Sequence, residues 1–322
     1  MRLRLKESMK ELLRTNDPAR LSWLTSVLSG SGIEAVVLDT HTSILEGQIG
    51  AIPRRVMVID EDFEEAHALI VSAERDLAET DTVGTLLGGR VALDQPREGY
   101  RVAIDPVLLA ASVPALESGC VLDVGTGVGA AALCYAWRSP GVEVMGLELQ
   151  SSLSELAMEN GARNGLQNDV RFVCGDLLNP PSDVASGGFD HVMANPPYLP
   201  ANRADTRIGD AKAISHVEGE AGLLDWIEFC LRMVTPKGVM TMIHRADRLD
   251  EILAALHGRA GEIVVFPLWP KREVSPKRVI VRARAGSKTP LRISPGMVLH
   301  EDDGSYTEMA SEILVDGAPI DL

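Results

Sequence analysis

The sequence is poor in cysteine, lacks a long uninterrupted apolar run, and has fewer basic than acidic residues. Its four cysteines show no C-x-x-C spacing, so we expect reduced, buried and inert thiols that form neither metal sites nor disulfides. No uncharged apolar stretch approaches the roughly 18 residues of a membrane span, and the amino end has no secretory signal. We therefore expect a soluble cytoplasmic protein without metal or membrane partners.

The net charge of −15 argues against a nucleic-acid binder that is basic throughout. The stretch from Arg259 to Arg292 departs from this balance, because nine Lys and Arg residues face only Glu262 and Glu273 there. A local patch of this sign can bind phosphates, since salt screens charges beyond about 10 Å. A solvated surface is the alternative. Three prolines indicate an exposed loop around the first of these cations (Pro267, Pro270, Pro276). The candidate phosphate-binding residues are Lys271, Arg272, Lys277 and Arg278.

The length of 322 residues with 45% apolar content predicts about two domains. Residues 9–73 carry a β-α-β-β-α pattern, which predicts a small α+β domain. This pattern resembles a small bacterial domain described as signal-transducing, with a PII-like fold. Residues 74–87 are mostly polar and acidic and are predicted to be a linker, so the second domain covers residues 88–322.

The second domain alternates predicted strands with helices, which favours an α/β fold with a mostly parallel sheet. We expect its site along the carboxyl edge of that sheet, where polar residues follow successive strands. The expected elements are a hairpin of 90–94 with 99–102, a helix from 105, strands at 120–124, 142–147, 170–174 and 190–194, and helices at 130–137 and 152–164.

A glycine-rich turn follows the first buried strand of this domain directly. Gly125, Gly127 and Gly129 alternate with Thr126 and Val128 and lead into a helix, so the backbone can approach a ligand closely. Dinucleotide-binding folds use G-x-G-x-x-G around a pyrophosphate. The tighter spacing here predicts a ligand without pyrophosphate at this point. Asp123, two residues before the first glycine, offers a carboxylate to a cationic or amine-bearing group.

Two further acids stand at the ends of the next strands. Glu148 is placed to bind two ribose hydroxyls, and Asp176 to accept a hydrogen bond from an adenine amino group. Each of them alone is equally compatible with a helix cap. Together with the glycine turn and the motif that follows, they indicate one ligand site.

The motif Asn195-Pro196-Pro197-Tyr198 follows the last predicted strand. The prolines prevent both a helix and a central ladder, so the chain leaves the sheet in a stiff extended form. The Asn195 amide and the Pro196 carbonyl then become fixed acceptors beside the Tyr198 ring. That combination suits a planar amide or an exocyclic amine. A Pro-Pro turn with a surface tyrosine is the structural alternative.

In this order, these features resemble the class I S-adenosylmethionine-dependent methyltransferases. The resemblance implies a Rossmann-like sheet with helices on both faces and the cofactor S-adenosyl-L-methionine. It places the methionine part over the glycine turn, the ribose on Glu148 and the adenine beside Asp176. Asn195-Pro-Pro-Tyr implies methylation of a planar nitrogen, either N6 of adenine or the amide nitrogen of glutamine.

Within this class the chain resembles the bacterial tRNA(Val) N6-adenine methyltransferases, which implies a tRNA partner and an anticodon-loop adenine as acceptor. In this reading Tyr198 stacks on the extruded base. Two alternatives stay open: a glutamine methyltransferase acting on release factors, and a non-catalytic ligand sensor. The stretches that carry the resemblance are Gln95-Pro96, Gly99-Tyr100-Arg101, Asp105 to Ala110, Arg278 to Val281, Val298 to Glu301 and Gly304-x-Tyr306-Thr307.

Overall fold

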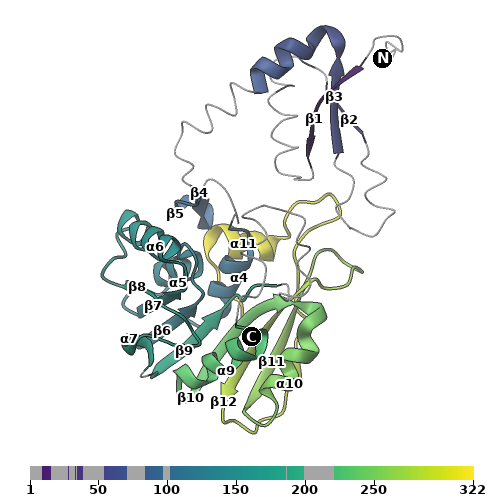
Figure 1. The fold of residues 1–322 in the computed structure, drawn as a ribbon. Helices are drawn as coiled ribbons and strands as arrows, with labels where there is room; N and C mark the ends of the chain where they lie inside the picture. Colours follow the sequence, from purple (N-terminus) through teal and green to yellow (C-terminus); the bar gives the residue numbers. More distant parts are fainter. Residues whose placement is uncertain are drawn as a thin grey trace. The chain divides into compact units, whose positions relative to one another are not determined.

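The computed structural model forms two compact units, Met1–Thr82 and Val83–Leu322 (Figure 1). It describes residues 9–15, 28, 33, 35–38, 54–70, 84–96, 102–185, 187–198 and 221–322. Most of the predicted first helix and residues 74–83 of the predicted linker lie outside this range, so the linker stays a prediction. No helix within the described ranges is long and apolar enough to cross a membrane.

The first unit contains a small antiparallel sheet of three strands. Its order is β1 (Met9–Thr15), β3 (Arg54–Ile59) and β2 (Val36–Leu38), and residues 63–70 are helical. Val56 and Val58 alternate along β3 and are fully buried, as expected for a strand with one face against a helix. The predicted α+β character of this segment is thus confirmed in its described part.

The second unit is built on a nine-stranded mixed sheet whose order is β13-β11-β12-β10-β9-β6-β7-β8, with β14 beside β11. The adjacent strands β10, β9, β6, β7 and β8 are mutually parallel, whereas β12 is antiparallel to both of its neighbours, β10 and β11. The strands are β6 (Cys120–Val124), β7 (Glu143–Glu148), β8 (Val170–Cys174), β9 (Phe189–Ala194), β10 (Val234–Arg245), β11 (Ala260–Trp269), β12 (Arg278–Ala285), β13 (Arg292–Ile293) and β14 (Met297–Val298).

The strand order reverses between β6 and β9, which is the topological switch point of this α/β sheet. The helix after β6 (residues 130–138) and the next described helix after β9 (residues 223–233) pack into the apolar cores on opposite faces of the sheet. In open α/β sheets ligands bind at such a switch point, outside the carboxyl ends of the strands. Val124 of β6 and Ala194 of β9 are paired in these adjacent strands, so the residues that follow them lie at the switch point and form the candidate site.

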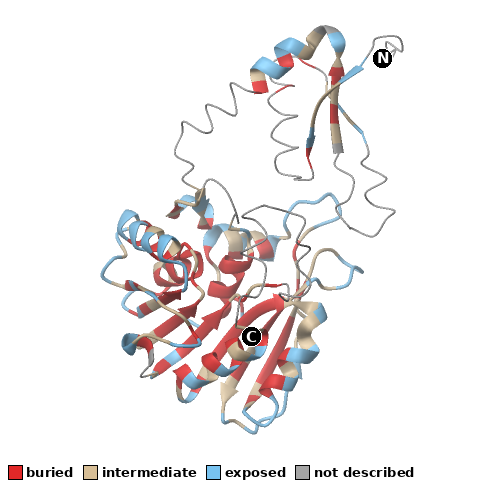
Figure 2. Ribbon diagram, in the orientation of Figure 1, coloured by how far each residue is buried: buried red, intermediate tan, exposed pale blue. Residues whose placement is uncertain are grey.

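Helices cover both faces of the sheet (Figure 1) and enclose two separate apolar cores. The strands between them are buried along most of their length (Figure 2). One core contains side chains of α4 (Asp105–Ser112), α5 (Ala130–Arg138), α6 (Ser151–Arg163) and α11 (Glu308–Asp316). The other contains side chains of α7 (Ser182–Ala185), α9 (Leu223–Met233) and α10 (Leu249–Leu256). The predicted α/β class is confirmed.

The predicted hairpin has a different first arm. β5 (Val91–Leu93) pairs with β4 (Gly84–Leu86), which precedes it, and Val102 is not in a strand. Residues 97–101 lie outside the described range. The turn between the two strands has positive φ at Gly88 and Gly89, a conformation that glycine adopts without a steric cost.

Two other sequence expectations need correction. Pro267 lies inside β11 rather than in a loop, and only residues 270–277 connect β11 to β12. Cys174 is exposed and Cys120 is half-buried, whereas Cys134 and Cys230 are buried as expected. Burial raises the pKa of both Cys134 and Cys230 to about 12, so these two thiols are unreactive.

Candidate active site at the switch point

The glycine turn leaves β6 and is fixed against β7, because the amides of Gly125 and Thr126 both donate to the Leu147 carbonyl at 2.8 and 3.0 Å. Its three glycines all have positive φ. A Cβ on Gly125 would lie 2.4 Å from the Trp226 ring, and one on Gly129 would lie 2.8 Å from Phe172.

Gly127 differs from the other two glycines of the turn. A Cβ there would meet no heavy atom of the described residues within 4 Å. The chain itself therefore fills the space beside Gly125 and Gly129, whereas the turn leaves open space beside Gly127. This is the side of the turn that a ligand can approach.

Asp123 lies beneath the turn and is 2% exposed. Its Oδ2 accepts hydrogen bonds from the Thr126 hydroxyl at 2.6 Å and from the Ala132 amide at 3.2 Å. Burial raises the pKa of Asp123 to about 7, although these two hydrogen bonds favour the charged form. In this structure the carboxylate thus ties the turn to the start of α5.

Glu148 ends β7 and spans the gap to the glycine turn. Its two oxygens accept from the Gly127 amide and the Gln150 amide, each at 2.9 Å, and the residue is 6% exposed. Burial raises the pKa of Glu148, and the backbone hydrogen bonds oppose that shift. A carboxylate has about four lone-pair sites, so Glu148 can accept further hydrogen bonds from a ligand.

Asp176 follows β8, one strand further along the same edge. Glu148 pairs with Cys174 across the two strands, and the Gly175 amide donates to the Glu148 carbonyl at 2.8 Å. The half-buried Asp176 uses Oδ1 to accept from the Leu178 amide at 2.9 Å. The two predicted acids are therefore neighbours at the carboxyl edge.

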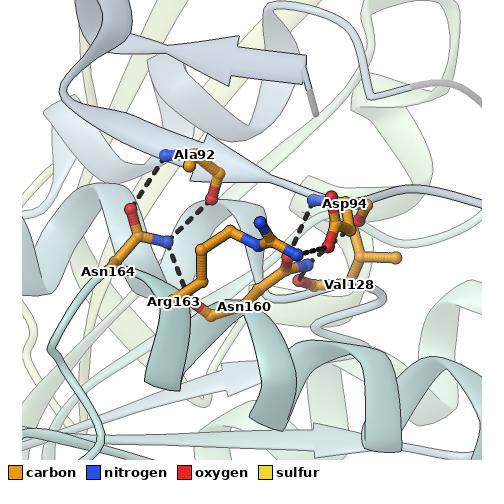
Figure 3. Close-up of polar contacts among 6 residues, drawn as sticks. All are labelled: Ala92, Asp94, Val128, Asn160, Arg163 and Asn164. Atoms are coloured by element: carbon orange, nitrogen blue, oxygen red, sulfur yellow. Dashed lines mark hydrogen bonds and ion pairs between the residues drawn. The ribbon is translucent and has the colours of Figure 1, made fainter. Parts of the chain in front are cut away.

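Asn160 is a fully buried residue that sequence reasoning did not identify. Its amide exchanges hydrogen bonds with the backbone of Asp94 beyond β5, and Nδ2 also donates to the Val128 carbonyl of the glycine turn at 3.0 Å (Figure 3). Asn164, one helical turn later, pairs in the same way with Ala92. The hairpin is thus joined to α6 by side-chain amides, and through Asn160 to the turn. The only feature of the sequence that could have indicated these contacts is the i, i+4 spacing of the two asparagines, which places them on one face of the helix.

The motif after β9 lies at the same edge of the sheet. Ala194 pairs with Val124, so Asn195 and Gly125 leave neighbouring strands at one level. Asn195 and Pro197 are half-buried, and Pro196 is buried. The Tyr198 hydroxyl oxygen lies 2.8 Å from Asn195 Oδ1 and also contacts Asp105 Oδ2.

The Tyr198 ring is only 9% exposed. The Arg278 guanidinium lies over it at 4.4 Å from the ring centroid, and the His244 ring meets it edge-on at 5.4 Å. The Arg278 guanidinium therefore occupies one face of the ring, and an acceptor can stack on that face, as the sequence predicted, only if the guanidinium moves. Burial lowers the pKa of His244 to about 4, so it adds no charge here near neutral pH.

The predicted basic patch divides into two parts. Arg278 starts β12, and its Nε donates to Asp105 at 3.0 Å, so it belongs to the motif rather than to an open surface. The other three candidates lie on the loop 270–277, which joins the ends of β11 and β12 at the site edge. We call them the edge cations: Lys271, Arg272 and Lys277.

Several cations counted in the sequence have carboxylate partners from distant parts of the chain. Arg259 pairs with Glu228 of α9, and Arg284 pairs with Glu262. Both arginines lie near the paired residues Ala260 and Ala285, at the edge of the sheet opposite the site. The patch is consequently smaller than the sequence count indicated. Among the described residues no group of three potential metal ligands occurs.

Comparisons with known proteins agree with this architecture. Residues 102–215 match the family described as "Methyltransferase small domain", and residues 9–74 match the one described as "Putative prokaryotic signal transducing protein". A tRNA1(Val) (adenine(37)-N6)-methyltransferase of Aeromonas hydrophila is 26% identical over 67% of this chain and 89% of its own. A release factor glutamine methyltransferase of Vibrio cholerae is 30% identical over 64% of this chain and 75% of its own.

Among solved structures, a protein from Agrobacterium tumefaciens described as a predicted O-methyltransferase superposes with a TM-score of 0.55 at 23% identity. The match covers 67% of this chain and 98% of that one. Fold, glycine turn and relatives together define an enzyme of the methyltransferase class. The chain belongs to the S-adenosylmethionine-dependent methyltransferases that carry the methyltransferase small domain, and a signal-transducing-type domain precedes it.

Proposed function

We propose that this enzyme transfers a methyl group from S-adenosylmethionine to N6 of an adenine in a single-stranded loop of a tRNA. The observation that carries the proposal is the pairing of Val124 with Ala194, which brings the glycine turn and Asn195 side by side. Similarity to tRNA1(Val) (adenine(37)-N6)-methyltransferases and the position of the edge cations support an RNA acceptor.

The residues present fit the cofactor. Open space beside Gly127 accommodates its methionine part, and the spare lone pairs of Glu148 suit the ribose hydroxyls. The half-buried Asp176, at the end of the adjacent strand, is assigned to the adenine amino group. When bound, the cofactor supplies an activated methyl on a sulfonium centre.

The chain then has to align the acceptor nitrogen and exclude water. An exocyclic amine is a weak nucleophile, because its lone pair is delocalised into the ring. Hydrogen bonds from this amine to the Asn195 amide and the Pro196 carbonyl would favour a pyramidal nitrogen with its lone pair directed at the methyl. A loop adenine is already single-stranded, so its removal from the stack costs little.

The direct test is methyl transfer to tRNA that lacks the modification, followed by mass analysis of the nucleosides. We expect N6-methyladenosine with the intact enzyme. We expect none with Asn195→Ala, which should still bind S-adenosylhomocysteine as tightly as the parent enzyme. An active Asn195→Ala variant would contradict the assigned role.

A second candidate function is glutamine methylation of release factors. The 30% identity to a release factor glutamine methyltransferase favours it, and the same acceptor motif can hold a planar amide. Methylation of a release factor with no transfer to tRNA would replace the RNA proposal by this one.

A further inference from the structure

Three side chains form a polar network that reaches the Asn195 amide through one of them. Asp105 comes from the first turn of α4, Tyr198 from the motif itself and Arg278 from the start of β12. The Tyr198 hydroxyl contacts Asp105 Oδ2 and lies 2.8 Å from Asn195 Oδ1. Arg278 Nε donates to the same Asp105 oxygen at 3.0 Å. Nothing in the acceptor motif's sequence indicates that α4 takes part.

The number of protons in this network restricts its arrangement. A tyrosine hydroxyl has one proton, yet both Asp105 Oδ2 and Asn195 Oδ1 are acceptors. Only one of the two contacts can therefore be a hydrogen bond donated by Tyr198. A carboxylate forms the stronger bond, because charge-assisted hydrogen bonds are shorter and roughly twice as strong as neutral ones. Arg278, which is always cationic, forms an ion pair with Asp105, and an ionised carboxylate can only accept hydrogen bonds.

With its proton on the Asp105 side, the Tyr198 oxygen presents a lone pair to Asn195. A carboxamide has nearly the same shape after a half-turn about its last torsion. That half-turn replaces Oδ1 by Nδ2, which donates to Tyr198 and completes a chain of hydrogen bonds from Asn195 through Tyr198 to Asp105. The oxygen of the amide then lies on the side away from Tyr198.

We propose that Asp105, acting through the Tyr198 hydroxyl, sets the orientation of the Asn195 amide so that its oxygen faces the acceptor nitrogen. This inference rests on the proposed function, in which that nitrogen carries the N–H groups. In the opposite orientation the amide would present its own N–H groups to those of the acceptor. Asp105 and the Tyr198 hydroxyl are thus positioning groups for Asn195.

A double-mutant cycle on turnover tests the coupling. We expect Asp105→Asn and Tyr198→Phe each to lower kcat by roughly tenfold, because either change allows both amide orientations. KM for the cofactor should stay unchanged. The double variant should be no slower than Tyr198→Phe alone, because Asp105 acts only through the hydroxyl.

The matched control is Tyr135→Phe. It removes another buried hydroxyl, which donates to the Pro114 carbonyl at 3.1 Å away from the site. It should leave kcat unchanged, and Asp105→Asn should cost the same factor in its presence as in its absence. If the two tenfold losses of kcat multiplied in the Asp105→Asn/Tyr198→Phe variant, to a loss of roughly a hundredfold, the proposal would be overturned.

A second measurement needs no acceptor. In the full chain labelled with 15N-asparagine, the side-chain amide signal of Asn195 is identified by its loss in Asn195→Asp. We expect one of its protons to be protected from exchange in the parent enzyme, and this protection to disappear in Tyr198→Phe and in Asp105→Asn. A signal that neither substitution changes would overturn the proposal. Failure to methylate tRNA would instead refute the proposed function, since the amide signal is observed without any acceptor.

Discussion

Replacement of Gly127 by alanine tests where the cofactor lies. Gly127 has a φ of 58°, and a Cβ there would meet no heavy atom of the described part of the chain within 4 Å, so this part can accommodate the methyl group. The left-handed backbone costs a non-glycine residue about 1–2 kcal/mol. For a unit of this size that corresponds to a fall in melting temperature of roughly 2–8 °C.

The effect on ligand binding should be larger than this strain explains. The added methyl would enter the open space that we assign to the methionine part of the cofactor. We expect binding of S-adenosylhomocysteine, measured by calorimetry, to weaken at least tenfold, or by about 1.4 kcal/mol.

Gly141→Ala is the matched control. Gly141 has a φ of 85° and precedes β7 at the edge opposite the site, and a Cβ there would also meet no heavy atom within 4 Å among the residues that the structure describes. Both variants should therefore lose similar stability, and only Gly127→Ala should lose affinity for the ligand. Equal affinities in the two variants would refute the placement of the cofactor beside the turn.

Three further predictions concern stability, the hairpin and the acceptor. The pKa of Asp123, raised to about 7, means that the folded state holds a proton which the unfolded state releases above about pH 4. The free energy of unfolding should therefore fall by at most about 4 kcal/mol as the pH rises from about 4 to 7. In denaturant titrations Asp123→Asn should reduce this dependence of stability on pH. The same pH dependence in the parent enzyme and the variant would contradict the raised pKa of Asp123. Asn160→Ala and Asn164→Ala should each destabilise the fold by about 2–4 kcal/mol in thermal unfolding, but only Asn160→Ala should weaken cofactor binding, since it alone contacts the turn. Reversal of the three edge cations to glutamate should weaken tRNA binding and lower the slope of log affinity against log salt concentration by about two to three. Lys288→Glu, at the opposite edge, should change neither. Equal losses of affinity in the two variants would contradict the proposed interface.

The elements themselves were largely predictable from local sequence. β6 and β8 have the predicted bounds, β9 agrees within one residue, and α5 and α6 begin within one residue of the expected positions. The hairpin was not predictable in the same way. Its first arm, Gly84–Leu86, has no alternating apolar pattern, and the side-chain amides on α6 bind the second arm, at Ala92 and Asp94.

The order of the polar residues along the chain indicated the class of enzyme, through its resemblance to a known class, and the acids expected to contact the cofactor. A glycine turn, two acids and a proline-rich motif must meet at one edge when parallel strands alternate with helices, because all strands end on the same side. Sequence alone therefore indicated Gly127, Glu148, Asp176 and Asn195 as members of one site.

Only the tertiary structure decided which residues support that site. Asn195 contacts Tyr198, and Tyr198 in turn meets the Asp105 carboxylate, 93 positions earlier, and the Arg278 guanidinium, 80 positions later; helix and strand packing brings both of them in. The same packing pairs Arg259 and Arg284 with carboxylates at the opposite edge and Arg278 with Asp105, so only Lys271, Arg272 and Lys277 of the four candidate phosphate-binding residues lie on the loop at the site edge. Charge and hydrogen-bond partners depend on distance in space, and local sequence does not encode those distances.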